Sequence, residues 1–130
     1  MESIAWSEQT EVASITSFDI GIMPLVDEPF ERGKCGFKLI QYMACGLPVV
    51  ASPVGVNRQI VEHGANGFLA ETLAQWQEAL QTLAADAGLR QRMGQAGRRK
   101  VEQQFCIQVT GPRLAALLKG ATQTAVMETR

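Results

Sequence analysis

A glycine-rich turn that leads directly into a short helix and then an apolar strand is the feature that most restricts how this chain can fold. The segment is residues 33–55, GKCGFKLIQYMACGLPVVASPVG. Gly33 and Gly36 allow positive φ angles or a close approach of the backbone to a ligand. The helix that follows directs unpaired N–H groups and the positive end of its dipole toward the turn. This order of turn, helix and strand predicts an anion site, with phosphate as the natural occupant.

The helix expected over residues 37–45 has two different faces. One face is apolar and is expected in the core; it carries Phe37, Ile40 and Ala44, with Leu39 and Met43 beside them. Spacings of four and three residues place Lys34, Lys38 and Gln41 together on the other side. Two cations and an amide would then flank the anion site.

Apolar runs alternate with helical patterns along the first half of the chain. Helices are expected at 8–17, 37–45 and 57–63, and strands at 19–25, 48–52 and 67–70. Apolar strands separated by helices are typical of a parallel sheet covered on both faces. The fold class is therefore α/β, a partial Rossmann-like three-layer domain with a parallel sheet. A loop from 26 to 36 leaves the carboxyl end of one strand, where ligands of such sheets bind.

The rest of the chain is expected to form a C-terminal helical segment. A capping box is predicted at Thr72–Gln75, and Asp86 can cap the next helix. The glycine-proline pair at 111–112 is expected to break this segment before a last helix at 114–120. Residues 121–130 have little to pack against, so we expect them to fray.

Length and composition predict a single globular domain, residues 1–130. The 130 residues are 46% hydrophobic and 19% charged, which suffices for one domain core. A formal net charge of −1 gives no general attraction for nucleic acid, and no apolar run approaches the roughly 20 residues that span a bilayer. The first residues, MESIAWSEQTEV, include acids and lack the apolar region of a signal peptide, so we expect a cytoplasmic protein.

The cysteines and the single histidine do not form a metal-binding pattern. Cys35, Cys45 and Cys106 include no CxxC pair, and His63 is far from them in the sequence, which favours reduced thiols and argues against a metal site. Cys35 lies in the expected phosphate loop beside a lysine, a setting that favours a reactive thiol. His63 is expected to cap the end of the short 57–63 helix rather than to act in catalysis.

Charge is distributed unevenly along the chain. Residues 1–33 hold seven acids and one base, whereas the remaining residues hold six acids and eleven bases. The basic part includes the helix that faces the phosphate, which suits an anionic substrate. Arg98, Arg99 and Lys100 are expected to form an ordinary solvated helix face.

A long ordered match to a known family covers most of the chain. The match is carried by QYMACGLPVVASPVG and the following VNRQIVEHGANGFLA, and on these residues the chain resembles the C-terminal nucleotide-sugar domain of family-four retaining glycosyltransferases, which have the GT-B fold. The resemblance begins near Trp6, includes DIGIMPL at 19–25 and extends through LRQRMGQAGRRKVEQQF at 89–105. It implies transfer of a sugar from a nucleotide donor with retention at the anomeric carbon, and no metal or other cofactor.

Two positions depart from the family's pattern. The family usually has two glutamates eight positions apart here, the first near the sugar hydroxyls of the donor and the second on the ribose, and these positions are Gly33 and Gln41. Gln41 still donates and accepts hydrogen bonds to a ribose, but without the charge that makes such bonds roughly twice as strong. Glu28 or Glu31, just upstream, would supply a carboxylate to the sugar in one alternative.

The resemblance and the turn together assign the donor-binding site, which comprises Gly33, Lys34, Gly36, Phe37, Lys38 and Gln41. Backbone N–H groups around Gly36 and Phe37, with the two lysines, would stabilise the charge that develops on the departing diphosphate. No residue is assigned as catalytic.

The match covers only the middle and end of one domain of a two-domain enzyme. We therefore expect the donor-binding half of a glycosyltransferase, inactive alone, as a fragment, a truncated gene or a separate subunit. The alternative is a non-catalytic α/β module for association or nucleotide binding. The expected ligand is a nucleotide-sugar or a nucleoside diphosphate. The expected partner is the missing N-terminal half or a second copy that covers the edge strand at 19–25.

Overall fold

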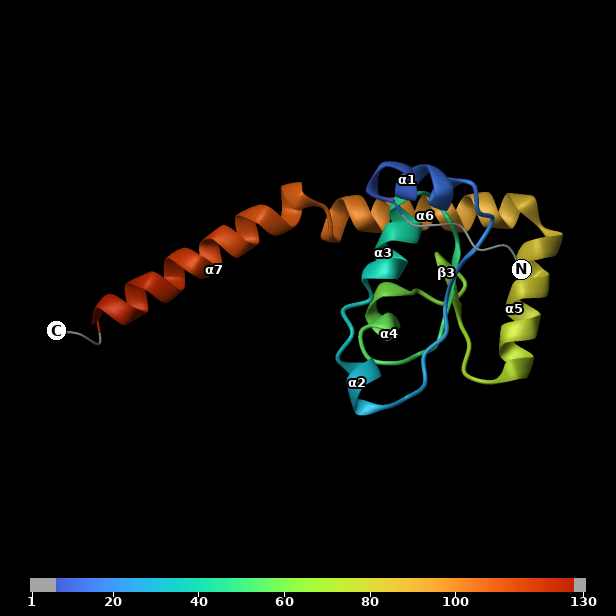
Figure 1. The fold of residues 1–130 in the computed structure, drawn as a ribbon, viewed down its shortest axis with the longest axis horizontal. Coiled ribbons are helices and arrows are strands. Elements are labelled where there is room, and N and C mark those ends of the chain that lie inside the picture. Colours follow the sequence, from blue (N-terminus) through green and yellow to red (C-terminus); the bar gives the residue numbers. More distant parts are fainter. Residues whose placement is uncertain (1–6, 128–130) are drawn as a thin grey trace.

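The computed structural model describes residues 7–127, with side chains to residue 121, and Trp6 lies outside this range. Ten elements follow one another: α1 (Glu8–Thr16), β1 (Gly21–Met23), α2 (Pro29–Arg32), α3 (Phe37–Ala44), β2 (Val49–Ala51), α4 (Asn57–Ile60), β3 (Gly67–Leu69), α5 (Leu73–Ala85), α6 (Ala87–Gln104) and α7 (Ile107–Met127). Figure 1 shows α3 and α4 on one side of the sheet, α5 on the other, and α7 extending away from the body. The predicted α/β fold with a parallel sheet is confirmed.

The sheet consists of three short parallel strands in chain order. Val49 of β2 pairs with Gly21 of β1 on one side and with Gly67 of β3 on the other. All three residues of β2 are buried, as expected for the central strand of a sheet with covered faces. Both β1 and β3 are edge strands within the described residues.

Two apolar clusters fill the spaces on the two faces of the sheet. The first joins α3, α4 and the end of α6 to β2, through Leu39, Met43, Val49, Ala51, Ile60, Val61 and Val101. The second joins α5 and the start of α6 to the opposite face, through Val50, Ala70, Ala79, Leu83 and Met93. Val50 points away from its two neighbours because successive side chains of a strand alternate between faces. The result is the predicted three-layer arrangement.

Side chains cap the start of both long helices at the predicted positions. The hydroxyl of Thr72 accepts the N–H of Gln75 at 3.3 Å, and Oε1 of Gln75 accepts the N–H of Thr72 at 3.1 Å. Asp86 accepts the N–H of Leu89 at 2.8 Å and begins α6. The capping box and the second cap are therefore confirmed.

Helix α7 contradicts the predicted break at 111–112. It runs from Ile107 to Met127 with Pro112 inside it. A proline in a helix removes one hydrogen bond, and the good helix formers after it, LAALL at 114–118, carry the helix onward. The helix also includes residues 121–127 of the expected frayed tail, and residues 128–130 lie outside the described range.

Two other predictions about short elements were wrong. The expected 26–36 loop contains the one-turn helix α2, which has Pro29 at its first position. Proline is tolerated there because the N–H group that it lacks would have no partner within the helix. The expected 57–63 helix ends at Ile60. Asn66 explains this early end because its side chain accepts the N–H of Glu62 and donates to the main-chain oxygen of Ile60.

Close contact between α6 and the turn before β2 brings the layers together. An added Cβ atom at Gly94 would overlap the main-chain oxygen of Gly46. The helix can approach this turn so closely only because residue 94 is a glycine. On the same helix, Arg98 and Arg99 are exposed as predicted, whereas Lys100 is only 8% exposed and departs from the predicted solvated face. The ammonium of Lys100 reaches the main-chain oxygen of Gln59 and the carboxylate of Glu62 at the end of α4.

No helix among residues 7–127 is long and apolar enough to cross a membrane.

Candidate functional site

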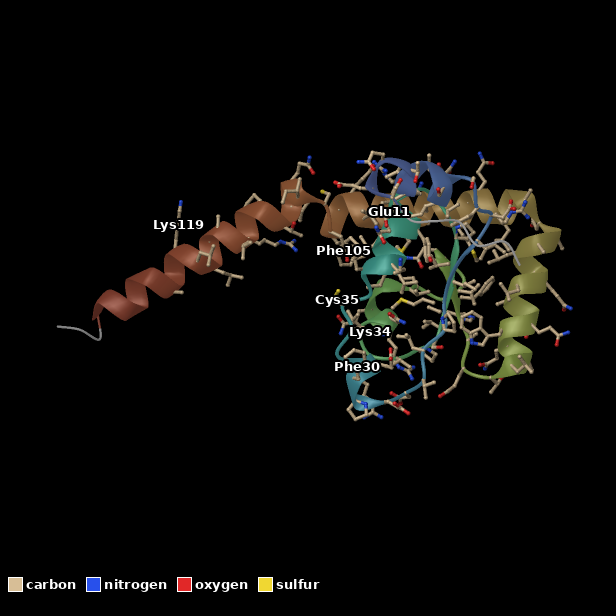
Figure 2. All side chains as sticks on the ribbon, viewed as in Figure 1. Glu11, Phe30, Lys34, Cys35, Phe105 and Lys119 are labelled. Atoms are coloured by element: carbon tan, nitrogen blue, oxygen red, sulfur yellow. The ribbon has the colours of Figure 1, made fainter. Side chains whose placement is uncertain are left out.

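An open cleft lies at the carboxyl end of β1, between α2 and the N-terminus of α3. Its volume is about 770 Å³, and its wall is formed by Met23, Pro29, Phe30, Gly33, Lys34, Cys35, Gly36, Phe37 and Lys38. Figure 2 shows Phe30, Lys34 and Cys35 on this side of the molecule. Five of the six predicted donor-binding residues therefore lie together, and Gln41 is the exception.

Gly36 shapes the floor of the cleft and begins α3. It adopts a left-handed conformation with φ of 68°, and an added Cβ atom would clash with Cδ1 of Ile60. Both its backbone angle and the close packing against α4 therefore require glycine. No side chain caps this end of α3, so the first N–H groups of the helix remain available to a ligand.

The two lysines on the cleft wall differ in their surroundings. The ammonium of Lys34 lies 2.6 Å from Oε2 of Glu31 and 5.4 Å from the centre of the Phe30 ring. Lys38 forms no ion pair within 4 Å with the described side chains. Lys38 therefore brings a positive charge without a carboxylate partner among the described side chains, whereas the charge of Lys34 is paired with Glu31.

Two aromatic side chains on the cleft wall are exposed. Phe30 is 78% exposed and Phe37 is 60% exposed. The prediction that Phe37 belongs to the core was wrong, because the buried face of α3 is formed by Leu39 and Met43, with Ile40 and Ala44 partly buried beside them. Exposed aromatic faces beside two cations suit a ligand that has both flat apolar and anionic parts.

Gln41 does not reach the cleft wall. Its amide donates to Oε1 of Glu11 on α1 at 3.3 Å, in a partly buried contact. Figure 2 shows Glu11 and Phe30 toward opposite ends of α3. The amide is thus already used by α1, and the helix that supplies Glu11 was not part of the predicted site.

Neither glutamate that was considered for the sugar lines the cleft. Glu28 precedes α2 and makes no side-chain cap. The carboxylate of Glu31 faces Lys34, and its Oε2 atom is buried. That oxygen accepts no hydrogen bond of good geometry from the described residues, so the ammonium of Lys34 is its charge partner.

The loop that carries the cleft is fastened to the strand beside it. The N–H of Leu25 donates to the hydroxyl of Ser52 at 2.9 Å, and the N–H of Ser52 donates to the main-chain oxygen of Met23 at 3.1 Å. Asn57, which is fully buried, donates to the main-chain oxygen of Ser52 at 3.0 Å. Sequence reasoning missed Ser52 and Asn57, and the only signal was that these two polar residues flank the PVGV segment after an apolar strand.

The cysteines and the histidine have separate surroundings. Cys35 is exposed on the cleft wall. Burial raises the pKa of the Cys45 thiol, with smaller opposing effects of Arg98, which lowers this pKa, and Glu11, which raises it. His63 lies beyond the end of α4 and accepts the N–H of Leu69 at 3.1 Å, so the predicted helix-capping role is wrong. Among the described residues, no three His, Cys, Asp or Glu side chains lie close enough to hold a metal ion.

Comparisons with known proteins agree on one family. Residues 7–86 match the family described as glycosyl transferases group 1. The N-acetyl-alpha-D-glucosaminyl L-malate synthase of Bacillus anthracis is 35% identical over 78 residues, which are 58% of this chain and 20% of that protein. A D-inositol 3-phosphate glycosyltransferase of Pseudarthrobacter chlorophenolicus is 35% identical over 80 residues, which are 60% of this chain and 18% of that protein. The chain spans about one fifth of the length of these curated relatives.

Solved structures share the same fold. Sucrose-phosphate synthase from Thermosynechococcus elongatus superposes with a TM-score of 0.76 at 26% identity, over 85% of this chain and 27% of that chain. The Anabaena protein HepE, solved in complex with UDP, superposes with a TM-score of 0.67 at 21% identity, over 82% of this chain and 29% of that chain. These matches confirm the GT-B resemblance that was stated from the residues. Since the family match covers more than half of its residues, the chain belongs to the group 1 glycosyl transferases.

Proposed function

We propose that the chain binds the diphosphate of a nucleotide-sugar donor at the N-terminus of α3, as the donor half of a retaining glycosyl transfer. One observation carries this proposal: the cleft joins the uncapped N-terminus of α3 to Lys34 and Lys38. The named relatives are sugar-transferring enzymes, and the structural neighbour from Anabaena was solved with UDP. We also propose a cytoplasmic location, which suits the free thiols of Cys35, Cys45 and Cys106.

The chemistry of this site would be the stabilisation of a leaving group. When the bond between the anomeric carbon and the diphosphate oxygen breaks, negative charge collects on that oxygen. Gly36, Phe37 and Lys38 line the cleft, and we propose that their N–H groups and the Lys38 ammonium would face this oxygen. Fixed donors of this kind act electrostatically, without a proton transfer and without a metal ion. We assign no general acid, base or nucleophile within the chain.

The exposed aromatic rings suit the remaining parts of a donor. Phe30 and Phe37 offer apolar faces on which a sugar ring or a base can lie. Gln41 remains the proposed ribose contact only for a donor that extends past the cleft wall toward α1, since Glu11 holds its amide and leaves its carbonyl oxygen to accept a hydroxyl hydrogen. Glu28 and Glu31 remain proposed sugar contacts only if they move, since neither lines the cleft.

A second candidate function is association rather than catalysis. It is favoured by the apolar side chains that the body and α7 leave exposed, which include Ile22 on the β1 edge and Leu114, Leu117 and Leu118 on α7. These surfaces suit contact with a second copy or with a larger partner, and an association module of this kind does not need a cleft that binds a donor.

Calorimetric titration separates the two candidates. The chain is titrated with inorganic pyrophosphate, UDP, GDP and ADP and with their sugar conjugates. We expect at least one diphosphate to bind. The bound compound should cover Cys35 on the cleft wall and slow its alkylation, while alkylation of Cys106, which lies outside the cleft, stays unchanged. Absence of binding by every compound at millimolar concentration would favour the association module.

A further inference from the structure

The wall of the cleft contains an ion pair whose members are not equally exposed. Oε2 of Glu31 is buried, and the Lys34 ammonium lies 2.6 Å from it. The side chain of Lys34 is 40% exposed, whereas that of Glu31 is 20% exposed. The lysine lies against the Phe30 ring and lines the cleft. The carboxylate is therefore behind the ammonium, on the side away from the open cleft.

We infer that Glu31 is a positioning residue that holds the ammonium of Lys34 at the cleft wall, where it meets a bound diphosphate. This inference rests on the proposed function, because it concerns the anion that the same cleft would hold. It assigns Glu31 a structural link to the ligand through Lys34, in place of the direct sugar contact considered from the sequence.

The backbone that carries Glu31 is itself held in place. Helix α2 begins with Pro29, which restricts the backbone, and Arg32 forms an ion pair with Asp27 at 2.7 Å. The main-chain oxygen of Arg32 packs against Gly55, where an added Cβ atom would lie only 2.6 Å away. The turn that follows β2 thus supports α2 from one side, and the Glu31 carboxylate has a defined position from which to hold Lys34.

A simple competition between Glu31 and the ligand for Lys34 is the opposing possibility. If the ammonium left Glu31 for the ligand, a buried carboxylate oxygen would lose its charge partner, which is costly. An ammonium has three N–H donors, so Lys34 can keep Glu31 and still donate to an anion in the cleft. Burial of Oε2 therefore favours positioning over competition.

The test is a calorimetric titration of the full chain with inorganic pyrophosphate. Glu31→Gln should weaken binding about two- to fivefold, the range for a partly exposed ion pair, even though it removes a negative charge from the vicinity of the anion. The loss should vanish in the Lys34→Ala background, because Glu31 acts through Lys34. Glu8→Gln is the control, since it removes an exposed carboxylate on α1 that has no contact with Lys34, and it should bind pyrophosphate at least as tightly as the parent chain.

Two outcomes of the titration would overturn the inference. Tighter binding by Glu31→Gln would show that Glu31 competes with the ligand, and an equal loss in the Lys34→Ala background would show that Glu31 acts without Lys34. A ligand-free measurement keeps the inference testable if the parent chain does not bind pyrophosphate; the proposed function is rejected only if the nucleoside diphosphates and their sugar conjugates do not bind either. In NMR spectra of the reductively methylated chain, the Lys34 signal should shift in Glu31→Gln and stay in place in Glu8→Gln. An unmoved Lys34 signal would also overturn the inference.

Discussion

The ammonium of Lys100, on α6, lies 2.8 Å from the main-chain oxygen of Gln59 in the last turn of α4 and 2.6 Å from Oε1 of Glu62. The contact joins two elements that are far apart in the sequence. It satisfies a carbonyl oxygen at the end of a short helix that lacks a glycine cap, and it places a positive charge at the negative end of that helix.

Replacing this lysine should weaken the fold. Lys100→Met keeps the apolar stem but leaves the carbonyl of Gln59 without its donor, so we expect a loss of about 1–3 kcal/mol in the free energy of unfolding. Arg99→Met is the control, because Arg99 is the neighbouring exposed cation. Urea denaturation followed by circular dichroism measures both variants. Equal stabilities would mean that the buried ammonium contributes nothing.

Lys38 should contribute directly to anion affinity. Lys38→Ala removes the cleft lysine that has no carboxylate partner among the described side chains. We expect the Kd for pyrophosphate to rise by about one to two decades, because a charge-assisted hydrogen bond contributes roughly 1.5–3 kcal/mol. Lys119→Ala is the control, since Figure 2 shows Lys119 on α7, away from the cleft. Calorimetry gives both values, and an affinity unchanged by Lys38→Ala would remove this residue from the site.

The contact between Gln41 and Glu11 changes how ribose recognition must be tested. Gln41→Glu alone would place two carboxylates about as far apart as the present 3.3 Å hydrogen bond, and we expect lower thermal stability from their repulsion. The double variant Glu11→Gln, Gln41→Glu exchanges the two groups and keeps the bond. If residue 41 contacts the ribose, the double variant should bind UDP about fivefold more tightly relative to pyrophosphate, because a charged acceptor adds roughly 1 kcal/mol. An equal gain for both ligands would contradict ribose recognition there.

Close packing at Gly94 should make this position intolerant of any side chain. Gly94→Ala would push a methyl group into the main-chain oxygen of Gly46, and we expect a loss of about 1–3 kcal/mol or more in the free energy of unfolding. Gly111→Ala, in α7, is the control. Its added methyl group makes only ordinary contacts with Ile107, and alanine lowers the conformational entropy of the unfolded chain. That control should be neutral or stabilising. A tolerated alanine at 94 would mean that α6 sits further from the turn than described.

The chain should self-associate at micromolar concentration. Ile22 is 49% exposed on the edge strand β1, and an exposed edge with apolar side chains favours pairing with a second copy. Sedimentation velocity should show a concentration-dependent dimer, and Ile22→Lys should weaken it. Leu118→Lys, on the exposed face of α7, tests the other apolar surface independently. The expected dimer surface includes residues 1–25, of which 1–6 lie outside the described range. A monomer at all concentrations would exclude association through either surface.

The sequence was a good guide where local chemistry decides the structure. The Thr72–Gln75 cap, the apolar β2 strand and the glycine turn before α3 all depend on neighbouring residues, and all occur as predicted. Five of the predicted donor residues came together for the same reason, since they belong to one turn and one helix end.

The failures concern contacts between residues distant in the sequence. Periodicity placed Phe37 in the core because it cannot show that Leu39 and Met43 already fill the space beneath α3. Lys100 was expected in solvent because nothing near it in the sequence reveals the end of α4. Gln41 was placed at the ligand because the partner that holds its amide comes from α1, thirty residues earlier.

The order of the strands has a kinetic consequence. Within residues 7–127, each strand pairs only with the strand that precedes or follows it in the chain. The connection from β1 to β2 contains α2 and α3, and the connection from β2 to β3 contains α4. Pairings of this kind close short loops, which costs less entropy than joining the two ends of a chain. Folding can therefore begin at either pair around β2 and spread outward. The cleft is lined by β1, α2 and α3 and supported by α4 and the turn after β2, so it can take shape before α7 has formed.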